Sequence, residues 1–254
     1  MAYTKHLLSA AIVAHCAFAA LSAATAGTLV WTGGGDATSF TDGANWSGTP
    51  TGGTIDKAAL VDDYVIDDPA ATVSEGGNHT LSGGSLTVLA GEIQRPAFQG
   101  VAGALGTTSQ LTVDGGIVRQ WFVSANAGVG TVLEVSVGGT GELELFGAGG
   151  AVNNGDGDVM INLTGTNAKL TFLQKTAAEV VAQYQGDIFI GGIASVFGAD
   201  PLTLESGDNA YIVENAASGA DNVTVYSAVP EPTACGLGLA SAAWIVVGRR
   251  RRGA

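Results

Sequence analysis

Two pairs of adjacent carboxylates are the side chains in this sequence best placed to do chemistry. Asp62-Asp63 and Asp67-Asp68 stand five residues apart. Paired carboxylates carry out glycoside hydrolysis in many enzymes, and they can also hold calcium. Enzymes that cleave acidic polysaccharides usually need basic residues as well, and those are sparse here. The pairs therefore suggest a hydrolytic site, a calcium site or solvated turns.

A third acidic group lies at residues 153–158, which read Asn-Asn-Gly-Asp-Gly-Asp. Asp156 and Asp158 are its candidate ligands for a weakly bound Ca²⁺. The segment lacks the glutamate that an EF-hand places at its twelfth position, and it is not repeated in tandem. A tight turn, in which Asn and Gly supply positive φ angles, is the alternative. We predict no other cofactor.

Histidine and cysteine restrict the remaining chemistry. Both cysteines, Cys16 and Cys235, lie near the ends of the chain, and His79 is the one histidine between residues 27 and 228. The body therefore has no thiolate metal site, and a Ser-His-Asp triad would have to use His79. Because His79 follows Gly-Gly-Asn, we expect it to lie in a turn rather than in a catalytic site.

Aromatic side chains offer a different function. Trp31, Phe40, Trp46 and Trp121 could stack on sugar rings, which would make the body a carbohydrate-binding module. Aromatic residues near a first strand also pack over an open end of a core. Both interpretations remain open from the sequence.

Charge excludes one class of partner. Residues 27–228 carry five basic and 22 acidic side chains, a net charge of −17. Nucleic acids and anionic lipids are bound largely through Lys and Arg, so the sequence predicts no nucleic-acid binding. An acidic surface could instead gather divalent cations.

The body is predicted to consist of short strands. Apolar and polar residues alternate with period two, and Gly, Asn and Asp separate the runs. A pair of apolar residues recurs at Leu86, Leu111, Leu133 and Ile161, in steps of 25, 22 and 28 residues. Glycine-rich turns follow the first three pairs. Such steps favour a right-handed parallel β-helix, an all-β solenoid in which coils stack on one another; a β-sandwich is the alternative.

One segment predicts a short helix. Thr176 and Glu179 form a capping box, and Gly186 could end the helix in the left-handed conformation. We expect this helix to cover one end of the strands.

The N-terminus predicts an export signal. Lys5 precedes an apolar run of residues 7–21, and Ala24-Thr25-Ala26 fits a small-residue cleavage site. Cleavage after Ala26 would make Gly27 the first residue of the mature chain, leaving residues 27–228 as the body.

The C-terminal residues 229–254 have three parts in order. Val229, Pro230, Glu231 and Pro232 come first, an apolar stretch of residues 233–248 follows, and the arginines close the segment. The arginines are Arg249, Arg250, Arg251 and Arg252. An apolar helix followed by arginines halts in the membrane with the charges on the cytoplasmic side.

This tail resembles the PEP-CTERM sorting signal, on the motif, the helix and the arginine cluster just described. The resemblance implies recognition by an exosortase-type membrane protease, transient anchoring in the inner membrane and cleavage near Pro232. The same tail pattern is also known as an ice-binding protein C-terminal domain. The strands show no regular Thr-x-Thr ladder, so we do not predict ice binding. Residues 29–47 loosely resemble the first strands of autotransporter-like exported solenoids.

Together these features predict a non-catalytic structural or adhesive protein of the cell surface or extracellular matrix, with exopolysaccharide as a possible partner class. The alternatives are a carbohydrate-binding surface module and a small polysaccharide-cleaving enzyme on a β-helix.

Overall fold

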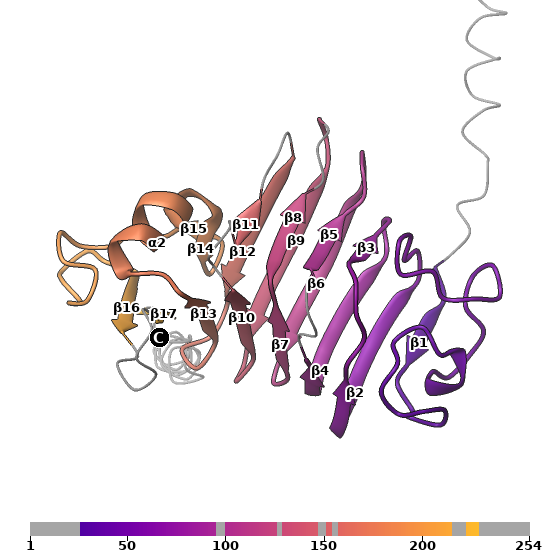
Figure 1. The fold of residues 1–254 in the computed structure, drawn as a ribbon. Coiled ribbons are helices and arrows are strands. Elements are labelled where there is room, and N and C mark those ends of the chain that lie inside the picture. The colour runs from indigo at the N-terminus through magenta and orange to yellow at the C-terminus, as the bar shows by residue number, and fades with distance from the viewer. Residues whose placement is uncertain are drawn as a thin grey trace, which may run out of the picture.

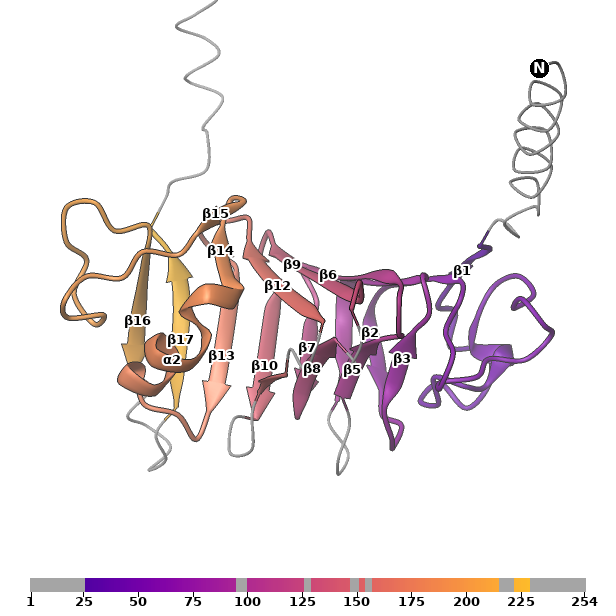
Figure 2. The same cartoon turned by 90° about the horizontal axis from the view of Figure 1, so that it is seen from above.

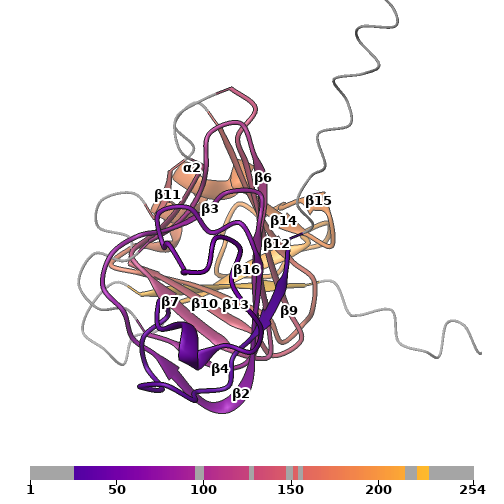
Figure 3. The ribbon, with the colours of Figure 1, turned by 90° about the vertical axis from the view of Figure 1, so that its right-hand side faces the viewer.

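The computed structural model describes residues 26–94, 100–125, 129–146, 151–153, 157–214 and 222–228. They form a parallel β-solenoid of about five turns with one short α-helix (Figure 1). The predicted solenoid is confirmed, and the sandwich alternative is not found. Figure 3 looks along the solenoid from its N-terminal end and shows the strands on three sides of the coil.

Each complete coil crosses three sheet faces in turn. The first face contains β1 (Thr28–Val30), the starts of β2 (Asp63–Val73) and β4 (Ser85–Ile93), β6 (Thr108–Asp114), β9 (Val132–Gly138), β12 (Asp158–Leu163) and β14 (Ile188–Ile190). The second face contains the ends of β2 and β4, then β7 (Ile117–Gln120), β10 (Glu142–Phe146) and β13 (Lys169–Leu173). The third face contains β3 (His79–Leu81), β5 (Gly100–Gly103), β8 (Phe122–Ala125) and β11 (Val152–Asn153).

The inward side chains form apolar columns that run along the solenoid. On the first face, Leu86 pairs with Leu111, Leu111 with Val135, Val135 with Ile161, and Ile161 with Ile188. All five are at most 2% exposed. Equivalent residues in neighbouring parallel strands lie about 4.8 Å apart, so each column is a continuous apolar stack.

The register differs from the sequence prediction at one coil. We expected Leu133 to be the partner of Leu111, but Leu133 pairs with Ser109, and Leu111 pairs with Val135. Because side chains alternate with period two, a slip by two residues keeps every apolar residue inside. The pattern alone therefore cannot detect such a slip.

Glycines at the corner between the first and second faces allow the coils to stack closely. Gly91, Gly115 and Gly139 all have positive φ, as expected of the predicted glycine-rich turns. A Cβ on Gly115 would lie 2.5 Å from the carbonyl oxygen of Leu89 in the previous coil. This corner therefore needs glycine both for its φ of +112° and for the close approach.

A non-repetitive segment before β2 closes the N-terminal end. Trp31, Phe40 and Trp46 are buried there with Tyr64 of β2, and their rings contact one another at centroid distances near 5 Å. A short 3-10 helix, η1 (Gly43–Asn45), ends beside these rings. We call residues 31–60 the N-terminal cap.

The C-terminal end is closed by a helix and antiparallel strands (Figure 2). These are α2 (Ala177–Tyr184), the 3-10 helix η3 (Gln185–Asp187), β15 (Ile193–Ala194), β16 (Ala210–Glu214) and β17 (Val223–Ser227). β15 pairs antiparallel with β14, β17 with β13, and β16 with β17. We call residues 174–227 the C-terminal cap.

The predicted capping box is confirmed and the predicted helix end is wrong. The Thr176 hydroxyl accepts from the Glu179 N–H, and the Glu179 carboxylate accepts from the Thr176 N–H. Gly186 is not left-handed, because the chain continues into η3. The Tyr184 ring stacks on Phe172 of β13, and its hydroxyl accepts from the Ala151 N–H at 3.1 Å. The helix thus covers the end of the strands, as expected.

Candidate functional site

A shallow groove of about 390 Å³ lies on the outer side of the first face. Three consecutive strands supply its walls because their outward residues align in register: Glu134 and Ser136 from β9, Met160 and Asn162 from β12, and Phe189 from β14. The five side chains are half-buried, whereas their neighbours along each strand point into the core. Gly192, in the turn after β14, closes one side of the groove.

The groove combines an apolar surface with uncharged polar groups. Phe189 and Met160 provide the apolar surface. The Asn162 carbonyl accepts from the Gly192 N–H at 2.9 Å, and no described residue accepts from its amide group. Glu134, the one charged residue among the described residues that line the groove, accepts from the Gln110 amide at 3.0 Å. A ring with hydroxyl groups would find both stacking and hydrogen-bonding partners here.

The outer side of the second face is charged and internally paired. Arg119 pairs with Glu92 and with Glu144, and Lys169 Nζ lies 3.7 Å from Glu142. The other described basic residues of the body are also engaged. Lys57 contacts Glu75, and Lys175 donates to the Gln183 amide at 2.9 Å. Each described basic side chain therefore already has a polar partner, which is a carboxylate for three of them and a neutral amide for Lys175.

The paired aspartates do not act as pairs. Asp62 is 1% exposed and accepts from the Gly27 N–H at 3.0 Å and from the Thr51 N–H at 2.8 Å. Asp63, the next residue and the first of β2, instead accepts from the Ser85 hydroxyl. The expectation of a solvated turn at Asp62 was wrong, because long-range hydrogen bonds hold it inside.

Hydrogen bonding also sets the ionisation of Asp62. Burial by itself would raise the pKa of this carboxyl, but hydrogen bonds from the Thr51 hydroxyl, the Thr51 N–H and the Gly27 N–H hold it below its usual value. The charged form is therefore the one that the site stabilises.

The second aspartate pair lies at an irregularity in β2. The register between β2 and β4 shifts on both sides of Asp67, and Asp68 accepts from the Ala70 N–H at 2.9 Å. No three carboxylate, histidine or cysteine side chains of the described residues come together as a metal site would require. Asp158 is exposed at the start of β12, and Asp156 lies outside the described residues.

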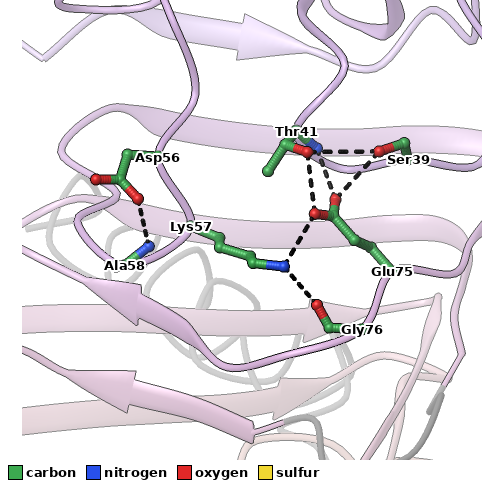
Figure 4. A network of polar contacts seen from close by, with 7 residues as sticks. All are labelled: Ser39, Thr41, Asp56, Lys57, Ala58, Glu75 and Gly76. Atoms are coloured by element: carbon green, nitrogen blue, oxygen red, sulfur yellow. Dashed lines mark hydrogen bonds and ion pairs between the residues drawn. The ribbon is translucent and has the colours of Figure 1, made fainter.

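A second polar network, centred on Glu75, joins the N-terminal cap to the first coil (Figure 4). Its carboxylate accepts from the Thr41 N–H at 2.7 Å, from the Thr41 hydroxyl at 2.9 Å and from Lys57 Nζ at 3.3 Å. Lys57 also donates to the Gly76 carbonyl at 2.6 Å. Burial alone would raise the pKa of Glu75, but the bonds from Thr41 and Lys57 lower it. These contacts tie loops together and leave the carboxylate occupied.

His79 is buried and begins β3, so the prediction of a turn was wrong. Its side chain takes the place that Val101 and Val123 occupy in the next coils, and its ring contacts Phe40 at 4.8 Å. Nε2 has no hydrogen-bond partner among the described residues. Burial lowers the pKa of His79 to about 4, against the pull of Glu75. A neutral imidazole inside the core fits packing rather than catalysis.

The tryptophans divide into two groups. Trp31 and Trp46 are each 4% exposed, and Trp46 Nε1 donates to the Phe40 carbonyl at 2.8 Å, so this cluster cannot stack on a sugar. Their second predicted role, packing over an open core end, is confirmed. Trp121 is half-buried and contacts Phe146 of β10 edge-to-face, with ring centroids 4.1 Å apart.

The predicted sorting features lie almost entirely outside the described residues. This holds for Ala24, for the motif Val229–Pro232 and for the arginines 249–252, whereas Ala26 and Gly27 are described. Within the described parts of the chain, no helix has the length and apolarity needed to cross a bilayer.

Comparisons with protein families, with curated proteins and with solved structures give no match. Sequence reasoning also missed the groove on the first face. Its signal was the outward set of residues in the aligned repeats, which can be read only once the register of β9, β12 and β14 is known.

Proposed function

We propose that this is an exported structural or adhesive protein of the cell surface or extracellular matrix, delivered by an exosortase-type system and without catalytic activity. Residues 1–26 would direct export, and residues 229–254 would anchor the chain in the inner membrane until processing near Pro232. The order of these segments around the body supports the proposal.

The observation that carries the structural role is the capped solenoid. Continuous apolar columns run through about five turns, and separate caps cover both ends. At about 4.8 Å per coil, five turns give a stack roughly 24 Å long, to which the two caps add further length. The body thus suits a stiff spacer. Parallel strand connections are nearly always right-handed, which supports the predicted hand of the coil.

Intact mass and cell fractionation of the protein from its native host would test delivery. The proposal expects a chain that lacks residues 1–26 and the arginines 249–252 and that is found at the outer surface or in the matrix. A variant with Glu231→Ala in the sorting motif should stay in the inner membrane, whereas Glu214→Ala, a change of the same type in β16, should be delivered normally. A wild-type chain that keeps the arginines in the inner membrane would contradict sorting.

Divalent cations could link such acidic solenoids to one another or to polysaccharide. The body carries 22 acidic residues, and the four described basic residues are all engaged, so its surface is strongly negative. Equilibrium dialysis with calcium, together with light scattering, tests this idea. Association that needs millimolar calcium would support bridging, and no uptake at that level would rule it out.

The groove favours a second candidate function, binding of a neutral glycan. An anionic chain would be repelled by the net charge of −17, and the described basic side chains are already engaged with other groups. A neutral sugar ring can stack on Phe189 while its hydroxyl groups meet Ser136 and the Asn162 amide. The groove crosses three coils, so an extended glycan would lie along the solenoid axis.

Affinity electrophoresis in gels that contain dextran, hydroxyethyl cellulose or alginate would test glycan binding. We expect retardation in a neutral gel, loss of retardation in Phe189→Ala, and normal retardation in Phe146→Ala, which removes a half-buried ring from the second face. Binding at the groove should leave tryptophan emission unchanged, because none of the described tryptophans lines it. If Phe146→Ala rather than Phe189→Ala abolished retardation, the glycan would bind near Trp121, whose ring contacts Phe146. No retardation in any gel would reject this candidate and leave the delivery proposal untouched.

A further inference from the structure

The buried carboxylate of Asp62 holds the backbone at the predicted cleavage site. Asp62 Oδ1 accepts from the Gly27 N–H at 3.0 Å, and the Gly27 carbonyl accepts from the Asp63 N–H at 2.9 Å. The same carboxylate accepts from the N–H and hydroxyl of Thr51 at 2.8 and 2.5 Å. Gly27 is therefore fixed in place on both sides, immediately before β1.

The Asp62 site has a negative charge without a matching positive one. Asp62 is 1% exposed, and no basic side chain of the described residues pairs with it. A buried carboxylate that has only neutral donors is costly compared with one that faces a cation. The nearest titratable neighbours supply none: Asp63 is acidic, and burial together with the Asp62 charge raises the pKa of Tyr64 to about 12.

Cleavage of the export signal would create the missing cation at this position. Hydrolysis of the Ala26–Gly27 peptide bond adds water: the hydroxyl goes to the Ala26 carbonyl carbon and the other hydrogen goes to the Gly27 nitrogen as the C–N bond breaks. The new Ala26 carboxyl group loses its proton, and the Gly27 amine takes one up. An α-amino group has an ordinary pKa of about 7.7–8.0, so it is largely protonated at neutral pH.

We propose that Asp62 is a binding site for the α-ammonium group of Gly27 in the mature chain. This inference rests on the proposed export and on cleavage after Ala26. In the precursor, Gly27 offers Asp62 one neutral N–H donor. In the mature chain, Gly27 would offer an ammonium group with three donors, so a charge-assisted hydrogen bond would replace a neutral one. Maturation would thus strengthen the attachment of β1 to β2, directly beside the N-terminal cap.

Two forms of the chain, one starting at Gly27 and one retaining Ala26, would test this pairing. The Gly27 form should melt a few degrees higher at pH 7. Its advantage should disappear in Asp62→Asn, which keeps the shape of the side chain but removes the charge. Because pairing raises the pKa of the amine in the folded state, the advantage is present below about pH 8 and is lost as pH rises through the raised pKa.

NMR titration of the Gly27 amine provides a second measurement that does not depend on a variant folding. We expect a pKa above the ordinary range in the folded protein. An ordinary pKa, or equal melting of the two forms, would overturn the pairing even if the native protein starts at Gly27. A native protein that keeps residues 1–26 would instead refute the cleavage on which the inference rests.

Discussion

The two ends of the solenoid are closed by different means. At the N-terminal end, buried polar side chains hold irregular loops together, with Asn45 as the centre. Its side-chain oxygen accepts from the Gly35 and Ala37 N–H groups, and its amide donates to Asp36 and to the Ser39 carbonyl. At the C-terminal end, a helix and three antiparallel strand pairings do the same work through backbone hydrogen bonds.

This difference predicts how each end responds to damage. Backbone pairing spreads the stabilisation of the C-terminal cap over many bonds, and even the edge strand β16 is partly covered, because Ile212 donates to the Pro201 carbonyl. The loops of the N-terminal cap, outside its buried aromatic cluster, instead rely on a few polar side chains, and water cannot replace the hydrogen bonds of these side chains once they are buried. In a solenoid each coil contacts only its neighbours, so an end can open without unfolding the middle.

Asn45→Ala should have the largest effect of the substitutions considered for the caps. It removes four hydrogen bonds from a side chain that is 0% exposed and leaves buried backbone groups without partners. We expect a loss of about 3–4 kcal/mol, felt first in the N-terminal cap. Hydrogen exchange of β1 and β2 amides, compared with β13 amides, measures it.

Asn209→Ala is the matched control in the C-terminal cap. Asn209 accepts from the Val196 N–H and donates to the Ala194 carbonyl, but it is half-exposed, so water can replace the lost bonds. We expect a loss of about 1 kcal/mol. Equal losses of stability in Asn45→Ala and Asn209→Ala would show that the N-terminal cap does not depend more on its buried polar side chains than the C-terminal cap does.

Acid should weaken the N-terminal end through His79. Burial depresses its pKa to about 4 in the folded protein, whereas the unfolded chain has a pKa near 6.5. The unfolded state therefore binds a proton first as pH falls, and stability decreases between about pH 6.5 and pH 4 by roughly 3 kcal/mol. Urea unfolding at a series of pH values, followed by far-UV circular dichroism, measures this slope.

His79→Val provides the control, because valine fills the equivalent place at Val101 and Val123. The variant should lose most of the slope between pH 6.5 and 4. The variant should still lose stability below about pH 4.5 because of Glu75. Hydrogen bonds from Thr41 hold the pKa of Glu75 below its usual value, and protonation of Glu75 removes the stability that these bonds provide. An unchanged slope in His79→Val would place the acid sensitivity elsewhere.

Local sequence patterns predicted the repeating part of this fold well. Alternation identified the strands, the glycine-rich turns marked the corner at Gly115, and the capping box at Thr176 located α2. Each signal is contained in a few neighbouring residues. The register around Leu133 could not be found in this way, since strands that slip by two residues bury the same face.

Contacts between distant residues were the part that the sequence could not predict. Asp62 is buried because Gly27, 35 residues earlier, and Thr51 donate to it, and nothing near Asp62 in the sequence signals these partners. His79 follows a typical turn sequence but falls at an inward position of the third face. The groove likewise depends on which outward residues of β9, β12 and β14 become neighbours.

Thr176→Ala should have a small effect, comparable with that of Asn209→Ala, because it removes only the N-cap of α2 and the C-terminal cap has many other hydrogen bonds. The hydroxyl accepts from the Glu179 N–H at 3.3 Å in an exposed position. Loss of such a cap costs about 1 kcal/mol. Thr176→Ser keeps the hydroxyl and should restore nearly all of the stability in urea unfolding. A loss in Thr176→Ala as large as that of Asn45→Ala would mean that α2, rather than the strand pairings, holds the C-terminal cap in place.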